Sequence, residues 1–116
     1  MNSEDFVEAL KRHVRDAAIK HTVANLQQPP GRSVTPQERV RSDWYKALSA
    51  EDAEHVNSVI ATAVDETLFG LLVVLDGART IVDDGGRFEL TYVTDQRVVL
   101  NDPQAIGLHE LLNAPN

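Results

Sequence analysis

The segment from about residue 50 to residue 75 constrains this chain most, because it is long, apolar and bounded by helix signals. Its apolar residues recur at steps of three and four, which is the spacing of one face of an α-helix. Ser49 and Asp52 form an N-cap pattern, and Gly77 suits the position just beyond a helix end. The segment therefore predicts one helix from about residue 50 to residue 75.

The end of this segment also permits a different structure. Asp76-Gly77 is a dipeptide typical of tight hairpin turns, and β-prone runs flank it at 71–75 and 78–82. Gly70 is a poor helix former and weakens the helical alternative. We favour the helix because its period continues without a break, and the hairpin stays open as the alternative.

Two more helices are expected before the long one. The first begins at Ser3 as its N-cap and reaches about Gln27, where two prolines and a glycine end it at 29–31. Phe6, Leu10 and Val14 lie on its predicted apolar stripe. The second starts at the capping box 35–38, which has proline at the first helical position.

The second helix has one apolar row. Val40, Trp44 and Leu48 recur at four-residue spacing, so we expect Trp44 to lie in the core. Substitution of a buried Trp44 by alanine would cost about 2–5 kcal/mol of stability. Tyr45 lies off this row beside Arg41, and an exposed Tyr near an Arg is typical of a binding hot spot.

Beyond residue 78 the apolar period changes to two. Residues 88–93 and 97–100 predict two antiparallel strands in a hairpin over 87–100, and residues 80–82 are a candidate third strand. Residues 101–103 then break the sheet before a short helix whose expected core contacts are Ile106, Leu108, Leu111 and Leu112. The order predicts an α+β fold in a single domain, 1–116, with residues 113–116 expected to fray.

The charge of the chain is uneven along its length. The net charge is −7, made of +2 over residues 1–46 and −9 over residues 47–116. An acidic half repels phosphate backbones, which argues against direct nucleic-acid binding and favours a basic protein surface as partner. The chain has no cysteine and no secretory signal pattern, and its longest apolar run, 68–75, is too short to span a membrane. These features predict a cytoplasmic protein without a membrane partner.

No motif for catalysis, a cofactor or a metal is found. His109-Glu110 begins a zinc-protease pattern, but Asn113 stands where the second histidine is required. We therefore name no catalytic residue, no cofactor and no metal ligand, and whether the chain is an enzyme stays open with the balance against it. The candidate partner-binding residues are Arg41, Tyr45, Asp65, Glu66, Asp83 and Asp84. A ligand-binding alternative consists of Asp76, Arg79, Asn101 and Asp102, which could converge at one end of the sheet.

One set of segments resembles a pattern of small uncharacterised bacterial proteins. It comprises residues 68–77, 88–93, 100–103 and 108–111, which read LFGLLVVLDG, FELTYV, LNDP and LHEL. The resemblance implies a bacterial, cytoplasmic, stand-alone domain, and it assigns a role to no residue.

Three functions are compatible with these features. The first is a small acidic protein-binding module that masks a basic partner, as inhibitor, immunity or antitoxin proteins do. The second is a homo-oligomeric structural or regulatory domain, including a homodimer, that uses a helix face or a strand edge. The third is a small-molecule binder or small enzyme with its site near Asp76.

Overall fold

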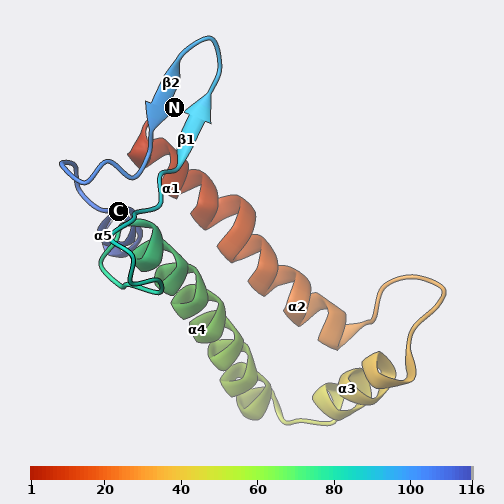
Figure 1. Cartoon of the computed structure of the whole chain (residues 1–116). Coiled ribbons are helices and arrows are strands. Elements are labelled where there is room, and N and C mark those ends of the chain that lie inside the picture. The colour runs from red at the N-terminus through yellow and green to blue at the C-terminus, as the bar shows by residue number, and fades with distance from the viewer. Residues whose placement is uncertain (116) are drawn as a thin grey trace.

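The computed structural model describes residues 1–115 and confirms the α+β class, with long helices beside one small hairpin. The elements are α1 (Ser3–Leu10), the π-helical segment η1 (Lys11–Asp16), α2 (Ala17–Gln27), α3 (Pro36–Lys46), α4 (Ala50–Leu75), β1 (Thr91–Val93), β2 (Arg97–Val99) and α5 (Leu108–Asn113). α2 packs along α4, with α3 at one end of the pair and the hairpin and α5 at the other (Figure 1).

The long helix is present as the sequence predicts. The Ser49 hydroxyl accepts the N–H of Asp52 at 3.1 Å and caps the start of α4. At its end the N–H of Gly77 donates to the Val74 carbonyl, and the next N–H donates to the Val73 carbonyl, each at 3.0 Å. This pair of bonds is a Schellman motif, and Gly77 has the positive φ of +78° that it requires. The alternative hairpin over 71–82 is therefore wrong.

The N-cap of the first helix lies one residue earlier than predicted. The side chain of Asn2, not Ser3, accepts the N–H of Asp5 at 2.8 Å. The Ser3 hydroxyl instead donates to the Leu100 carbonyl at 2.7 Å. A polar residue that the local pattern assigns to a cap thus ties the first helix to the end of the hairpin.

This helix is also not α-helical throughout. Its η1 segment is a π-helix, whose wider turns rotate the side chains that follow relative to an ideal α-helix. Val14, expected on the apolar stripe, is therefore 48% exposed, whereas Lys11 is buried. Arg15 reaches Asp65 of α4 across the gap between the two helices, at 3.5 Å.

The core lies where α1, α4 and α5 meet. Its buried members are Val7, Leu68, Leu72, Leu108 and Leu112. Leu108 and Leu112 confirm that the last short helix packs as predicted, and Leu111 packs at its margin. Ile106 is 62% exposed and was wrongly expected in the core, because it lies in the irregular segment before α5.

The orientation of α3 is the reverse of the prediction. Trp44 is 54% exposed and Val40 is 68% exposed, whereas Tyr45 is buried at 6% exposure. The Tyr45 hydroxyl donates to Oδ1 of Asn57 on α4 at 2.8 Å, and Ser42 is buried beside it on the same helix face. α3 packs mainly against α2, and the Tyr45–Asn57 bond links it to α4, so these contacts together select this face over the more apolar one.

The hairpin is shorter than the predicted 87–100. The register pairs Thr91 with Val99, Tyr92 with Val98, and Val93 with Arg97. One more bond, from the Leu100 N–H to the Leu90 carbonyl at 2.8 Å, extends the pairing by one step. Residues 87–89 and 80–82 form no strand. Within the described residues the sheet therefore has two strands.

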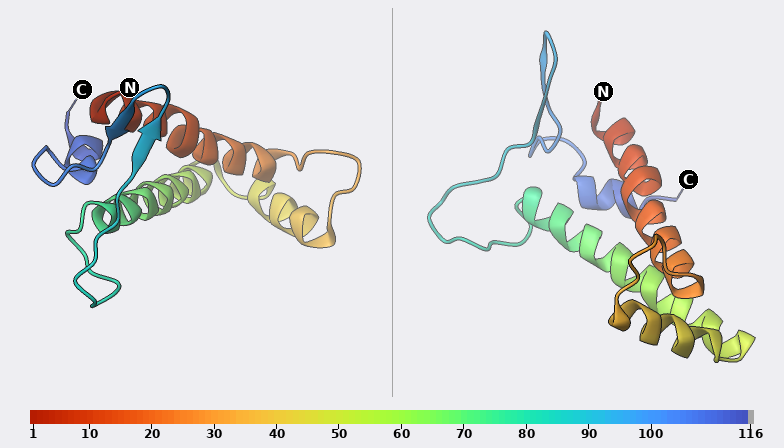
Figure 2. Two further views of the ribbon diagram at one scale, coloured as in Figure 1. Left: turned by 45° about the horizontal axis from the view of Figure 1, so that its top comes forward. Right: turned by 90° about the vertical axis from the view of Figure 1, so that its right-hand side faces the viewer.

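The molecule is extended for its length. Its accessible surface is 8437 Å², whereas a compact protein of its mass exposes about 6,300 Å². Its radius of gyration is 18.2 Å, against about 13 Å for a compact domain of this length. Residues 76–90 add to the extension, because they swing away from the helices as a wide loop (Figure 2). Residue 116, part of the tail expected to fray, lies outside the described residues.

Candidate functional site

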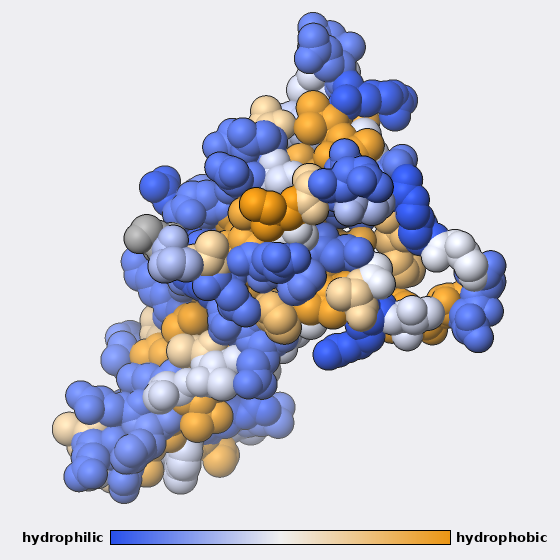
Figure 3. Space-filling view, turned by 90° about the vertical axis from the view of Figure 1, so that its left-hand side faces the viewer, coloured by the Kyte–Doolittle hydropathy of each residue, from blue (hydrophilic) through white to orange (hydrophobic). Residues whose placement is uncertain are grey.

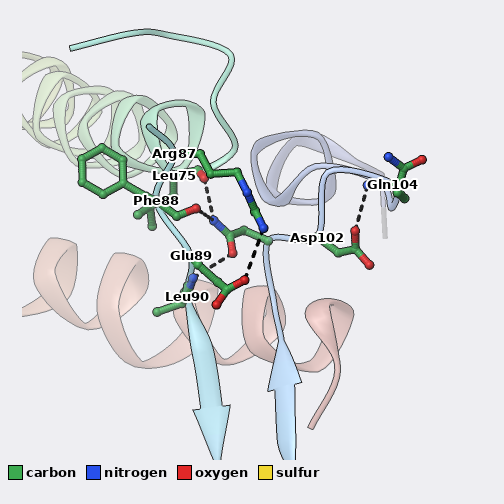
Figure 4. Close-up of polar contacts among 8 residues, drawn as sticks. Leu75, Arg87, Phe88, Glu89, Leu90, Asp102 and Gln104 are labelled. Carbon is green, nitrogen blue, oxygen red and sulfur yellow. Dashed lines mark hydrogen bonds and ion pairs between the residues drawn. The ribbon is translucent and has the colours of Figure 1, made fainter. Parts of the chain in front are cut away.

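The C-terminal end of α4 collects three of the four residues of the predicted ligand site. Asn101 is the most enclosed of them, at 6% exposure. Its Nδ2 donates to the carbonyls of Leu75 at 2.6 Å and Phe88 at 2.9 Å, and its Oδ1 accepts the N–H of Leu90 at 2.8 Å (Figure 4). The side chain thus fastens the end of α4 to the start of the hairpin.

Asp76 lies at the same end and is also engaged. Its carboxylate is 7% exposed, and its Oδ2 accepts both the backbone N–H of His109 at 2.9 Å and the ring Nδ1–H at 2.6 Å. Gly107 occupies the N-cap position of α5 and has no side chain to cap it. A Cβ built on Gly107 would lie 3.0 Å from Oδ2 of Asp76. Asp76 therefore supplies the cap from another helix, where the positive end of α5 favours a carboxylate.

Asp102 lies beside Asp76 and Asn101, whereas Arg79 lies apart from them. The Oδ1 of Asp102 accepts the N–H of Gln104 at 2.9 Å in an exposed turn. Asp76, Asn101 and Asp102 line one open hollow of about 230 Å³. Arg79 does not line it. The two buried members have their partners inside the fold, so Asp102, whose one bond is to the nearby Gln104 N–H, is the exposed carboxylate of the set at this hollow.

Arg79 lines a second hollow, on the loop side of α4. It has a volume of about 310 Å³ and is formed between the end of α4 and residues 77–88. Arg87 and Phe88 line it as well, together with Ile81 and Val82. The one sequence signal for this hollow is the length of the loop, since long loops without secondary structure are often functional.

The predicted partner-binding residues do not form one patch. Arg41 and Tyr45 lie on α3, Asp65 and Glu66 lie midway along α4, and Asp83 and Asp84 lie in the loop after α4. Asp65 is paired with Arg15, and Asp84 accepts the Gly86 N–H at 2.9 Å. Tyr45, buried against Asn57, is not available at the surface.

A surface that the sequence reasoning missed is apolar. Large apolar side chains are exposed on α3, on α4 and in the following loop; they are Val40, Trp44, Val59, Leu71, Ile81, Val82 and Phe88. Apolar residues also reach the surface among hydrophilic ones on the side that faces left in Figure 1 (Figure 3). The signal was present at the end of α4, where residues 68–75 are apolar on every side of the helix, since such a helix requires burial on every side.

α4 is also the element of residues 1–115 that is long and apolar enough to cross a membrane by length and composition. Only 17% of its most apolar 18-residue stretch is buried. The apolar run at 68–75 is by itself too short to span a membrane, whereas the complete helix is long enough.

Among residues 1–115, no group of three or more histidine and carboxylate side chains is placed to hold a metal ion. Comparisons with protein-family models, with curated proteins and with solved structures found no match to this chain. Its function is therefore argued from its own residues.

Proposed function

We propose that this chain is a protein-binding module that inserts the exposed face of α4 into an apolar groove on a partner whose rim is basic. The observation that carries the proposal is the exposure of α4, of whose most apolar stretch 17% is buried. Large exposed apolar patches on proteins mark interaction sites. No catalytic role is part of the proposal.

The area of the exposed surface supports a stable complex. The chain exposes 8437 Å², which exceeds the expectation for its mass by about 2,100 Å². A standard protein–protein interface buries about 800 Å² per partner, and obligate interfaces bury more. The excess is large enough for a permanent interface.

The exposed face of α4 has the spacing of a docking helix. Val59, Ala63, Thr67 and Leu71 follow at four-residue steps, and all four are exposed. The neighbouring row at 60, 64, 68 and 72 turns inward, ending in the buried Leu68 and Leu72. Helices that bind in grooves use anchors at such steps.

The charge of α4 indicates the charge expected at the rim of the partner's groove. The helix carries no Lys or Arg and five carboxylates: Glu51, Asp52, Glu54, Asp65 and Glu66. Complementary charge at a rim accelerates association and selects the partner. A basic rim around an apolar groove fits this helix, which keeps the inhibitor, immunity or antitoxin class as the leading proposal.

The area excess also favours a second candidate, a homodimer formed through the same face. Two copies with a net charge of −7 each would repel one another at long range, which weighs against it. Insertion of α4 into a membrane is less favourable, because Asp65 and Glu66 would lie near the bilayer centre at about 2.5–3.5 kcal/mol each.

Affinity capture with matched variants tests the proposal. The protein is immobilised, incubated with lysate at about 50 mM salt and eluted at about 500 mM, where exposed charge pairs are screened. The captured protein is then purified and its affinity is measured by calorimetry. We expect a basic partner whose binding is lost with Val59→Gln combined with Leu71→Gln.

Val93→Gln is the control, because Val93 is 53% exposed but lies on β1, away from α4. A purified complex that forms equally well with the α4 variant would contradict the proposal. Sedimentation of the chain alone, giving a dimer that the α4 variant dissociates, would establish the second candidate instead.

A further inference from the structure

We infer that the hollow between the end of α4 and residues 77–88 binds a small organic monocarboxylate with an apolar body. This site is separate from the α4 face of the proposed function and does not depend on it. The hollow measures about 310 Å³, at the lower end of the range for small-molecule sites.

The hollow has apolar side chains in its walls, and a hydrogen-bonded side chain fixes the loop that forms one of these walls. Val74 of α4 lines it together with Ile81, Val82 and Phe88 from the loop. Ile81, Val82 and Phe88 are 62%, 54% and 47% exposed, so a ligand here would cover apolar surface that the fold leaves in water. Asn101 joins the Phe88 carbonyl to the Leu75 carbonyl through one amide nitrogen. The loop wall is thereby fixed relative to α4.

Two cations line the same hollow. Residues 47–116 contain three arginines, and two of them, Arg79 and Arg87, meet here. Arg79 lies over Gly70, with its Nη1 3.7 Å from where a Cβ of Gly70 would be. It forms no ion pair within residues 1–115, whereas Arg87 makes one exposed pair with Glu89 at 3.3 Å. A carboxylate bound here would give Arg79 a partner.

The charge of the lining limits the ligand to one carboxylate. Asp84 also lines the hollow, where its Oδ1 accepts the N–H of Gly86 and shapes the turn before Arg87. Two guanidinium groups and one carboxylate leave a net charge of +1. A monocarboxylate neutralises this lining, whereas a dicarboxylate would bring a second charge towards Asp84.

Octanoate is the probe, and amide chemical shifts of the ¹⁵N-labelled full chain are the readout. We expect saturable shifts at Gly77, Gly86 and Phe88, which surround the hollow. Octanol and octylammonium, which share the apolar chain, should bind at least about tenfold more weakly, because octanol is neutral and cannot form an ion pair with arginine, and octylammonium has the same charge as arginine.

Arg79→Gln and Arg87→Gln should each weaken octanoate binding by about tenfold, the expected loss for removing one charge-assisted partner. Arg97→Gln is the matched control, because Arg97 is the third arginine of this half and is exposed on β2. It should leave the affinity unchanged.

Equal binding of octanol, equal loss with Arg97→Gln, or shifts confined to the Val59–Leu71 face would each overturn the inference. The inference would also be wrong if octanoate did not bind but a peptide with an apolar C-terminal residue did. That result would assign the hollow to the C-terminal tail of a protein. None of these outcomes bears on the partner-binding experiment, which uses other residues.

Discussion

Asn101 shows how one side chain can take the place of a longer strand. Residues 87–89 have no partner strand, and two of the groups around them bond to the Asn101 amide instead: the Phe88 carbonyl and the Leu90 N–H. The third bond, to the Leu75 carbonyl, satisfies one of the last acceptors of α4. A sidechain amide is suited to this position because it donates and accepts at once.

Substitution of Asn101 should therefore be costly. Asn101→Ala removes three hydrogen bonds at a buried site, and we expect a loss of about 2–4 kcal/mol in the free energy of unfolding. Asn101→Asp should be at least as harmful, because its second oxygen would face the Leu75 and Phe88 carbonyls. Urea unfolding followed by circular dichroism measures both. Asn25→Ala, at an exposed position of α2, should change stability by less than about 0.5 kcal/mol.

For these side chains, the sequence predicted which residues lie together but not which hydrogen bonds they form. Asp76, Asn101 and Asp102 do lie together, as their turn-forming positions indicated. Their partners are distant in sequence, however: Asp76 binds His109, 33 residues on, and Asn101 binds Leu75, 26 residues back. Local sequence spacing cannot predict such distant pairs. Asp76 and Asn101 were therefore predicted as ligand-binding residues, whereas their side chains hold the fold together.

Among the elements, α3 shows how tertiary contact can override a hydrophobic row. Val40 and Trp44 form the more apolar face, yet the face with Ser42 and Tyr45 is buried. Tyr45 gains both burial and a hydrogen bond to Asn57, which offsets the cost of leaving an indole in water.

This orientation reverses the expected effects of two substitutions. Trp44→Ala should cost less than about 1 kcal/mol, because the indole is mostly exposed. Tyr45→Ala should cost about 3–5 kcal/mol, as for other buried aromatic residues. Thermal unfolding of the two variants side by side measures the difference. A larger loss for Trp44→Ala than for Tyr45→Ala would mean that α3 packs by its other face.

The elements that could be predicted were those whose signals are local. Ser49 and Gly77 mark the ends of α4 by hydrogen bonds that span at most five residues, and both ends were placed correctly. The π-helical turns of η1 have no comparable signal, so Val14 was assigned to the wrong side. The prediction of a third strand at 80–82 was wrong, because residues with a high strand propensity form a strand only where a neighbouring strand is available for pairing.

For the whole molecule, the large exposed surface has a thermodynamic signature. The unfolded chain would expose about 18,600 Å², so folding buries about four fifths of what a compact domain of this mass buries. The denaturant m-value scales with the surface exposed on unfolding.

We therefore expect a urea m-value about one fifth below the trend for chains of this length, measured where sedimentation shows a monomer. Binding of a partner on the α4 face should raise it, because more surface is then exposed on unfolding. If the isolated monomer has an m-value on the trend, the chain in solution is more compact than a radius of gyration of 18.2 Å indicates.

The contact between the two ends of the chain also governs how the protein forms during translation. Ser3 bonds to Leu100 across 97 residues, and α1 packs on α5. A ribosome delivers α1 first and α5 last, so Val7 must wait for Leu108 and Leu112 to leave the exit tunnel. Until then the nascent chain exposes Val7, Leu68 and Leu72 at the C-terminal end of α4. Chaperone demand should therefore peak late in synthesis and fall once residue 112 has emerged.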